Sequence, residues 1–404
     1  MTRQSHLHPA DLRGFSRMTI DAVVGLTDLV EAMHHNIAST PALLGKPASG
    51  RTSGITGFVY RSVRGVAQMV GGGLDAVLGR LVPLFGEKEA TPEREVVLAT
   101  LNGVLGDYLE ASENPLAIRM RLRRDGRALQ MDKAALSAIP NAGSKLLVLA
   151  HGLCMNDLQW TRQGHDHGTA LARDLGYTPV YLHYNSGRHI STNGREFADL
   201  LEALLAHWPV PVKELAILGH SMGGLLARSA WHYGTAAGHA WPRHLKKLVF
   251  LGTPHHGAPM ERGGNWIDIT LGASPYTAPL SRLGKIRSAG ITDLRHTYLL
   301  DEDWHGRDRF ARSGRHHAAV PLPEGVQCFA IAATTGKQMG DMKDRLVGDG
   351  LVPLASALGC HAEDDRNLMF PQDRQWIAHA TGHLDLLCRT QVYERIKGWL
   401  AERP

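Results

Sequence analysis

Residues 215–224 read Leu-Ala-Ile-Leu-Gly-His-Ser-Met-Gly-Gly, a short apolar run that passes directly into a Gly-x-Ser-x-Gly turn. The residues that follow, Leu225 to His232, have the composition of a helix. Gly219 and Gly223 carry no side chains where a strand and the next helix crowd together, so the chain can turn sharply there. This context predicts that Ser221 is a nucleophile exposed at the end of a buried strand. The alternative is an ordinary strand-to-helix turn whose serine caps the helix.

The composition is typical of a globular protein. The chain has 404 residues, of which 43% are hydrophobic and 21% charged, and its formal net charge is +5. Its longest basic run, Arg119 to Arg127, alternates with apolar residues and predicts the solvated face of a hairpin. Because no basic tract is interleaved with aromatic residues, no nucleic-acid partner is expected.

The expected location is the cytoplasm. Residues 1–18 mix Arg, Asp and His and lack the apolar core of a signal peptide. No apolar run reaches the roughly 18–20 residues that span a bilayer. The four cysteines lack ligand-like spacing and are expected to be free thiols, with one disulfide as the alternative.

Two domains are expected from the change in hydrophobic period. Residues 1–114 predict an N-terminal helical extension, with helices in 20–37, 55–81 and 93–110 and a Pro/Gly/Ser linker at 40–53. Residues 115–404 begin with a hairpin signal, strands at 116–122 and 127–131 around Asp125-Gly126. Short apolar strands then alternate with helical segments; the strands are expected at 145–150, 178–183, 215–219, 247–252 and 326–333. This order predicts an α/β fold with a mostly parallel sheet covered on both faces.

A serine nucleophile requires a base and a group that orients the base, and candidates for both follow Ser221. Asp349 lies between two glycines after the last clear apolar strand, and it is favoured over Asp341 and Asp344 in the same loop. His383 lies in Ala-Thr-Gly-His-Leu-Asp before the terminal helix at 391–401, and a loop there would return its imidazole to the serine. Its competitors are His379, next to the strand expected at 375–378, and His361.

The reaction also requires N–H donors directed at a developing oxyanion. His151-Gly152-Leu153 follows the strand that ends at Ala150, and Gly152 permits the backbone to turn there. We expect the N–H groups of Leu153 and Met222 to form the pair, although a simple turn is the alternative for residues 151–152.

Together these motifs resemble the α/β-hydrolase superfamily, in particular bacterial lipases and lipase-like hydrolases that include GPI inositol-deacylase-type proteins. The resemblance covers about residues 116–404. It rests on segments in the order of the family: 151–153, 219–224, Gly252-Thr-Pro-His-His-Gly257, Asp349-Gly-Leu-Val-Pro353 and Gly382-His-Leu-Asp385. It implies an α/β-hydrolase fold and a catalytic triad of Ser221, Asp349 and His383. Residues 258–320 are rich in Gly, Pro, Arg and His and interrupt the alternation of strands and helices, so we expect them to form a lid or cap insertion over the active-site edge. The residues implied to line the site are His151, Gly152, His220, Gly223 and His255.

The resemblance implies a serine carboxylic-ester hydrolase, lipase- or esterase-like, that acts through an acyl-enzyme without a cofactor. The substrate would be an ester or lipid-like small molecule. Acyl transfer and thioester or amide hydrolysis would use the same residues, and a binding protein with an idle hydrolase fold is the alternative of another class. Asp385 matches a calcium-binding position of some bacterial lipases, but companion ligands are not recognisable, so no metal is expected.

Residues 1–114 have no counterpart in this resemblance. Their apolar stripe is expected to pack on the hydrolase or complete a cap. Homodimerisation and contact with a lipid surface through Arg51, Arg61, Arg64 and Arg80 are the alternatives.

Overall fold

The computed structural model describes residues 10–24 except 12 and 23, and residues 92–257, 288–306, 320–336 and 348–402. The predictions for residues 25–91, for Asp341 and Asp344 and for most of the 258–320 insertion lie outside these residues. The chain divides into two compact units, residues 1–94 with 109–117 and residues 95–108 with 118–404. The larger unit therefore includes residues 95–108, which the sequence grouped with the N-terminal extension.

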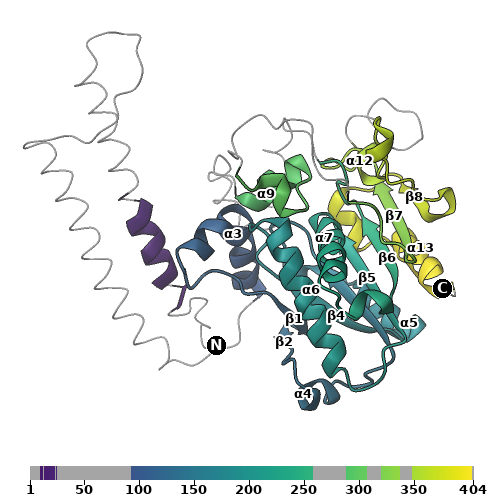
Figure 1. The fold of residues 1–404 in the computed structure, drawn as a ribbon, viewed down its shortest axis with the longest axis horizontal. Coiled ribbons are helices and arrows are strands. Elements are labelled where there is room, and N and C mark those ends of the chain that lie inside the picture. Colours follow the sequence, from purple (N-terminus) through teal and green to yellow (C-terminus); the bar gives the residue numbers. More distant parts are fainter. Residues whose placement is uncertain are drawn as a thin grey trace, which may run out of the picture. The chain divides into compact units, whose positions relative to one another are not determined.

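The described residues of the larger unit build an eight-stranded sheet, in the order β2-β1-β4-β3-β5-β6-β7-β8 (Figure 1). Its strands are β1 Arg121–Arg124, β2 Arg127–Ala128, β3 Lys145–Ala150, β4 Thr178–His183, β5 Glu214–His220, β6 Leu245–Leu251, β7 Gln327–Ala333 and β8 Gln375–Ala378. Strands β3 to β8 run parallel, whereas β1 pairs antiparallel with both β2 and β4. The predicted mostly parallel sheet is confirmed, and its topology is that of an α/β-hydrolase fold.

The first strand is shorter than the hydrophobic alternation suggested. It begins at Arg121 instead of Leu116, because Asn114 holds residues 116 and 117 in a turn. The Asn114 side-chain oxygen accepts a hydrogen bond from the Leu116 N–H at 3.0 Å, and the Asn114 backbone carbonyl accepts one from the Ala117 N–H at 2.9 Å. The hairpin turn is where the sequence placed it, with Asp125 and Gly126 both at positive φ.

Helices cover both faces of the sheet, as predicted, because successive residues of each buried strand point to opposite faces. In β3, Leu146 and Val148 join a cluster with α6 and α7, whereas Leu147 and Leu149 join one with α5 and α13. Figure 1 shows α6 and α7 in front of the sheet. The longer helices are α3 Pro92–Ala111, α5 His167–Leu175, α6 Ile190–His207, α7 Met222–Ala236, α9 Ala289–His296 and α13 Thr390–Ala401.

Several short helical segments connect these elements. They are α4 Lys133–Ser137, α10 Asp301–Trp304, α12 Leu354–Ala357 and the 3₁₀ turns η2 Asp157–Trp160, η3 Trp241–His244, η6 Asp364–Arg366, η7 Gln372–Arg374 and η8 His383–Leu387. Within the insertion, α9 and α10 pack on α6 and α7. The Ser229 hydroxyl donates to the Leu299 carbonyl at 2.8 Å, and the Ile190 N–H donates to the Asp293 carboxylate at 2.8 Å.

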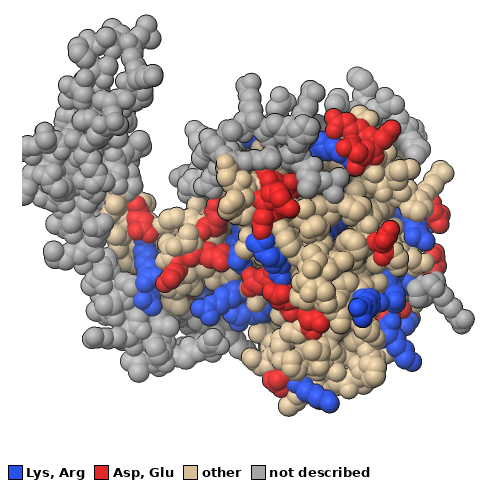
Figure 2. Space-filling model, viewed as in Figure 1, with Lys and Arg blue, Asp and Glu red and all other residues tan. Residues whose placement is uncertain are grey.

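The smaller unit is held together by polar contacts over long sequence separations. Arg94 forms an ion pair with Asp11 at 2.7 Å, and the Asn114 side chain donates to the Gly14 carbonyl at 3.1 Å. Among the described helices of the whole chain, none has the length and apolar character that crossing a membrane requires. On the face drawn in Figure 2, Lys and Arg side chains are interspersed with Asp and Glu.

Candidate active site

The turn after β5 holds Ser221 in a conformation that non-glycine residues rarely adopt, with φ 56° and ψ −124°. Hydrogen bonds fix the turn on both sides. The Ser221 N–H donates to the Leu251 carbonyl at 2.8 Å, and the Gly224 N–H donates to the Ser221 carbonyl at 3.1 Å. The Ser221 side chain is 1% exposed, and its hydroxyl makes no hydrogen bond to a described residue. Such local strain is typical of a functional position.

Three glycines make this turn sterically possible, as the sequence predicted for two of them. A Cβ on Gly219 would lie 2.6 Å from the Gly224 backbone, and one on Gly223 would lie 2.1 Å from the Ala150 carbonyl oxygen. A Cβ on Gly224 would lie 2.1 Å from the Thr253 hydroxyl. The start of α7 therefore lies directly against the ends of β3 and β5.

Replacing Gly223 by alanine is expected to lower the free energy of unfolding by about 2–4 kcal/mol, because a new methyl group would meet a backbone oxygen that cannot rotate away. Urea denaturation of the purified protein measures this change. Gly398→Ala is the matched control: no atom lies within 4 Å of a Cβ at this α13 position, so it should be neutral or stabilise by up to about 1 kcal/mol. Equal effects of the two substitutions would contradict the close approach of α7 to β3.

Asp349 lies in a tight turn whose two flanking glycines have positive φ, 54° at Gly348 and 99° at Gly350. One carboxylate oxygen, Oδ1, accepts hydrogen bonds from the N–H groups of Leu351 at 3.0 Å and Val352 at 2.8 Å. These bonds fix the carboxylate and leave its other oxygen, Oδ2, directed at His383.

His383 is the first residue of η8 and is 4% exposed. Its Nδ1 lies 2.7 Å from Asp349 Oδ2. Because an ionised carboxylate only accepts hydrogen bonds, this contact assigns the ring proton to Nδ1 and leaves Nε2 as the basic nitrogen. The two loops are also joined by their backbones, since the His383 N–H donates to the Asp349 carbonyl at 3.1 Å. A Cβ on Gly252 would lie 3.1 Å from both Asp349 Oδ2 and His383 Nδ1.

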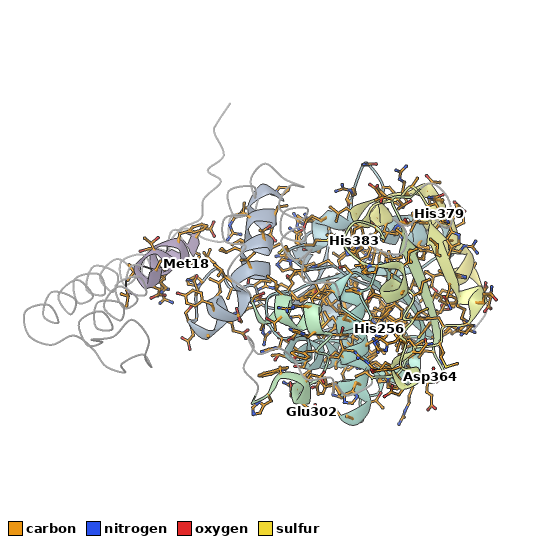
Figure 3. The ribbon with its side chains drawn as sticks, turned by 90° about the horizontal axis from the view of Figure 1, so that it is seen from above. Met18, His256, Glu302, Asp364, His379 and His383 are labelled. Carbon is orange, nitrogen blue, oxygen red and sulfur yellow. The ribbon has the colours of Figure 1, made fainter. Side chains whose placement is uncertain are left out.

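The competing histidines lie elsewhere. His379 directly follows β8 and is half-buried; Figure 3 labels it and His383 at separate positions, with His379 farther out. His361 packs against His256, with ring centroids 4.9 Å apart. Asp349 and His383, the acid and the histidine that the sequence favoured, are therefore in hydrogen-bond contact with each other.

The loop after β3 approaches the serine. A Cβ on Gly152 would lie 3.0 Å from the Ser221 Cβ, so only glycine leaves the space beside the serine open. Among the described residues, neither the Leu153 N–H nor the Met222 N–H has a hydrogen-bond acceptor. Two unpaired donors next to a buried hydroxyl form an arrangement that can accept an anionic oxygen.

Two further histidines, His151 and His220, lie near the serine turn and are neutral. His220 donates from Nε2 to the His383 carbonyl at 3.2 Å, and its ring lies 4.7 Å from the His383 ring. Burial lowers the pKa of His220 well below its usual value. His151 stacks on Tyr184 with ring centroids 4.4 Å apart, and burial lowers its pKa to about 3. Because both rings stay neutral near pH 7, they add no charge beside His383.

His255, another of the residues expected to line the site, is buried beside β6 and α7. It packs on Phe250 and Phe370, and its Nδ1 accepts a hydrogen bond from Arg228 at 3.3 Å. Arg228 is 3% exposed. Sequence reasoning missed Arg228 because it lies in the helix-forming run Leu-Leu-Ala-Arg-Ser-Ala. The sequence feature that could have identified Arg228 is its position seven residues after Ser221, on the buried side of the helix that follows the serine turn.

A second buried cluster was also missed, the charge cluster of Glu95, Arg123, Asp157 and His183. The Arg123 guanidinium lies 2.6 Å from the Glu95 carboxylate and 3.1 Å from that of Asp157. His183 Nδ1 lies 3.1 Å from Asp157. Arg123 is thus a half-buried ion-pair partner and not part of a solvated hairpin face, as the sequence had suggested.

This charge cluster contains three groups of the kind that bind metals, and their candidate ligand atoms all lie within 4.8 Å of one another. The Arg123 guanidinium already bridges the two carboxylates and supplies the charge that a divalent ion would bring. The contacts therefore fit a structural network that joins α3, β1, β4 and η2. Asp385, the position compared with a calcium ligand, instead accepts a hydrogen bond from the Gly382 N–H at 3.1 Å.

Comparison with known families agrees with this fold. Residues 167–325 match the family model described as "PGAP1-like alpha/beta domain". That segment includes β5, the serine turn and α7, and the predicted resemblance to lipase-like α/β hydrolases is confirmed. The search of the curated proteins gave no match.

Solved structures with a similar chain course include lipases and esterases. The mature lipase BlEst2 of Bacillus licheniformis is 15% identical, with 63% of this chain and 91% of that chain covered and a TM-score of 0.41. Lipase B of Aspergillus fumigatus is 12% identical, with coverage of 66% and 57% and a TM-score of 0.39. The esterase PF2001 of Pyrococcus furiosus is 14% identical, with coverage of 64% and 82% and a TM-score of 0.37.

Proposed function

We propose that the protein is a serine carboxylic-ester hydrolase that acts through an acyl-enzyme, with Ser221, His383 and Asp349 as its triad. The observation that carries the proposal is the 2.7 Å contact between His383 Nδ1 and Asp349 Oδ2, in a buried site beside the strained Ser221 turn. An acid that orients a basic imidazole next to a buried, unpaired serine hydroxyl is the arrangement that activates a weak nucleophile.

In the first half-reaction, Ser221 Oγ forms a bond to the ester carbonyl carbon while its proton passes to His383 Nε2. Asp349 holds the ring in the tautomer that can accept this proton and stabilises the imidazolium that results. His383 then gives the proton to the departing alcohol as the carbon–oxygen bond breaks. In the second half-reaction, a water molecule loses a proton to His383 and attacks the acyl carbon, which releases the acid and restores Ser221.

The oxyanion formed in each half-reaction would be bound by the N–H groups of Leu153 and Met222. Both donors are fixed by the backbone, so little reorganisation is needed as charge develops. A single donor of this kind is worth about 3–4 kcal/mol of barrier in other serine hydrolases. The neutral state of His151 and His220 supports this proposal, because neither ring competes with the donors for the anion.

The substrate class that fits is an ester or lipid-like small molecule. Acyl transfer to an alcohol and hydrolysis of thioesters or amides would use the same residues, and the described side chains do not favour one of them. Activity toward long-chain over short-chain p-nitrophenyl esters would place the protein with lipases, and the reverse preference would place it with esterases.

Covalent labelling with a fluorophosphonate tests the nucleophile. Ser221 Oγ should displace fluoride from phosphorus, so that the intact wild-type chain gains the mass of one phosphonyl group, located by peptide mass spectrometry on the peptide containing Ser221. Heat-denatured protein is the control, because an unfolded serine has no activating base. Failure of the native chain to react would reject the enzyme proposal and leave a binding protein with a hydrolase fold.

Asp349→Asn is expected to lower kcat by about 10⁴-fold. The asparagine oxygen can still accept the N–H groups of Leu351 and Val352, so the turn should remain folded. Its NH₂ group would then face His383 Nδ1 and favour the tautomer with the proton on Nε2, which cannot act as the base. Steady-state hydrolysis of p-nitrophenyl butyrate measures the change. Asp364→Asn, an exposed position in η6, is the control that should retain wild-type kcat.

A further inference from the structure

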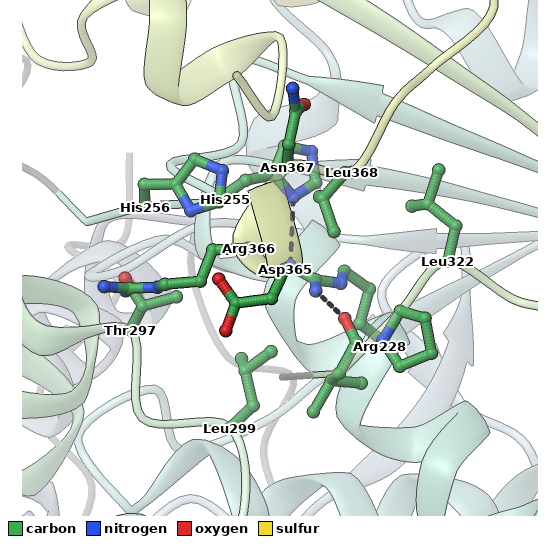
Figure 4. Close-up of a pocket in the computed structure, with 12 residues that line it drawn as sticks. Arg228, His255, His256, Thr297, Leu299, Leu322, Asp365, Arg366, Asn367 and Leu368 are labelled. Atoms are coloured by element: carbon green, nitrogen blue, oxygen red, sulfur yellow. Dashed lines mark hydrogen bonds between the residues drawn. The ribbon is translucent and has the colours of Figure 1, made fainter. Parts of the chain in front are cut away.

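A pocket separate from the proposed triad lies between α7 and the loops around it (Figure 4). Its volume is about 120 Å³, and it is lined by Arg228, His255, His256, Thr297, Leu299 and the segments 320–322 and 365–368. Ser221, Asp349 and His383 are not among its lining residues. The mechanism proposed above makes no use of this space.

The pocket contains a buried positive charge with no carboxylate partner among the described residues. The Arg228 guanidinium donates to the Val320 carbonyl and to His255, but its Nε–H has no acceptor among those residues. Burial lowers the pKa of Arg228 to about 10, which leaves it charged at pH 7. An unpaired buried cation is costly unless a ligand or partner supplies the opposite charge.

His255 adds a second unsatisfied donor. Since its Nδ1 accepts a hydrogen bond from Arg228, the ring of a neutral His255 carries its proton on Nε2. His255 Nε2 is buried and has no acceptor among the described residues. Two buried donors from different elements, Arg228 Nε–H and His255 Nε2–H, therefore lack acceptors at one cavity. Buried donors are usually paired, so this clustering requires an explanation.

The rim of the pocket carries charges of both signs. Arg366 of η6 lines it, as does the exposed Asp365, and Figure 4 shows the Asp365 carboxylate in the same space as these side chains. No ion pair joins Asp365 to Arg228 among the described residues. Arg366 would attract an anion that enters, whereas Asp365 would repel it.

We propose that this pocket binds an anionic group, the carboxylate or phosphate of a small molecule, with Arg228 and His255 as its buried donors. The volume suits a group of this size. Arg228 lies seven residues after Ser221 on α7, which corresponds to about 10 Å along the helix axis. That separation allows two sources for the anion: a charged end of the substrate, or a free anion bound while the ester occupies the serine site.

Binding of inorganic phosphate to the full-length protein tests the proposal without reference to activity. Sodium phosphate should raise the Tm above that in sodium chloride of equal ionic strength, by several degrees at saturation, because a ligand that binds only the native state stabilises it. Isothermal titration calorimetry should give a matching Kd. The absence of any phosphate-specific effect in the wild-type protein would overturn the proposal.

Substitutions locate the bound anion. Arg228→Met should abolish the phosphate effect, and His255→Gln should weaken binding several-fold. Asp365→Asn should tighten binding several-fold, because it removes a repelling charge from an exposed position that folding does not depend on. This last variant tests the pocket even if Arg228→Met fails to fold. Arg173→Gln, an exposed arginine of α5, is the matched control with unchanged binding. Binding that Asp365→Asn leaves unaltered would overturn the assignment to this pocket.

Kinetics with a neutral ester, p-nitrophenyl butyrate, and an anionic one, the p-nitrophenyl monoester of succinate, distinguish the two sources. If the pocket holds a charged end of the substrate, phosphate should compete with the succinate ester, and Asp365→Asn should lower the KM of that ester alone. If the pocket holds a free anion, phosphate should bind with equal affinity in the presence and absence of either ester.

Discussion

Ser221→Ala is expected to lower kcat for p-nitrophenyl butyrate by about 10⁶-fold, to the background left by binding and the oxyanion donors alone. The alanine keeps the Cβ that the strained turn already accommodates, and it removes only a buried hydroxyl that has no partner among the described residues. The Tm should therefore stay the same or rise, because a strained polar nucleophile is a stability cost that function requires. Activity assays together with thermal unfolding measure both effects.

The control for this substitution is Ser137→Ala. Ser137 is exposed, and its hydroxyl donates to the Lys133 carbonyl within α4, far along the chain from the proposed site. It should retain wild-type kcat. If Ser221→Ala kept more than about one per cent of the wild-type kcat while remaining folded, Ser221 would not be the nucleophile and the mechanism proposed here would be wrong.

The second large effect is loss of stability in mild acid. Among the residues that the structure describes, four histidines are at most 1% exposed: His151, His167, His220 and His255. Burial lowers the pKa to about 3 for His151 and about 4 for His167, and well below the usual value for His220 and His255. Above pH 6.5 these rings are neutral in both the folded and the unfolded chain. Below pH 6.5 the unfolded chain binds protons that the folded chain does not.

Each such histidine removes about 1.4 kcal/mol of unfolding free energy per pH unit below 6.5. One carboxyl acts in the opposite sense: burial raises the pKa of Asp293 to about 6, so the folded state gains one proton between pH 6 and about 4. The half-buried His256 adds a fifth ring, because burial also lowers its pKa to about 4. About four net protons remain, and the unfolding free energy should fall by about 5 kcal/mol per pH unit. Domain stabilities are only about 5–15 kcal/mol, so unfolding is expected near pH 4–5.

Urea denaturation at a series of pH values from 4.5 to 8 measures this dependence. His167→Gln should reduce the slope of unfolding free energy against pH by about 1.4 kcal/mol per pH unit, the contribution of one proton. His207→Gln, at an exposed position on α6, should leave the slope unchanged. A free energy of unfolding that is flat between pH 7 and pH 5 would contradict the neutral burial of these rings.

The parts of the fold that the sequence predicted are those with local signals. The run at 215–224 contains both its strand and the glycines that its turn requires, and the apolar period of the parallel strands follows from burial on both faces. Gly348 and Gly350 likewise marked Asp349, because a tight turn with positive φ needs glycine on both sides. The 2.7 Å pairing of Asp349 with His383 depends on two loops 34 residues apart, so the sequence could only rank candidates for it.

The features that the sequence missed depend on what a side chain meets after the chain has folded. Arg123 looks like any other basic residue of a hairpin, and its ion-pair partners, Glu95 and Asp157, come from distant segments. Arg228 lies in a good helix-forming run, and the sequence contains nothing that identifies a cavity beside it. For the same reason the predicted strand at 116–122 is shortened at its start, where Asn114 captures two backbone N–H groups in a turn.

The charge cluster around Arg123 limits where the chain can be shortened. Removing residues 1–114 would delete Glu95 and leave the Arg123 guanidinium with one of its two carboxylates. The same cut would remove Asn102, whose side chain accepts the Ile118 N–H at 2.8 Å, and Gly106, whose carbonyl accepts the Asn185 side chain at 2.9 Å. A recombinant fragment intended to isolate the larger unit should therefore start no later than Pro92, the first residue of α3, so that residues 95–108 are retained.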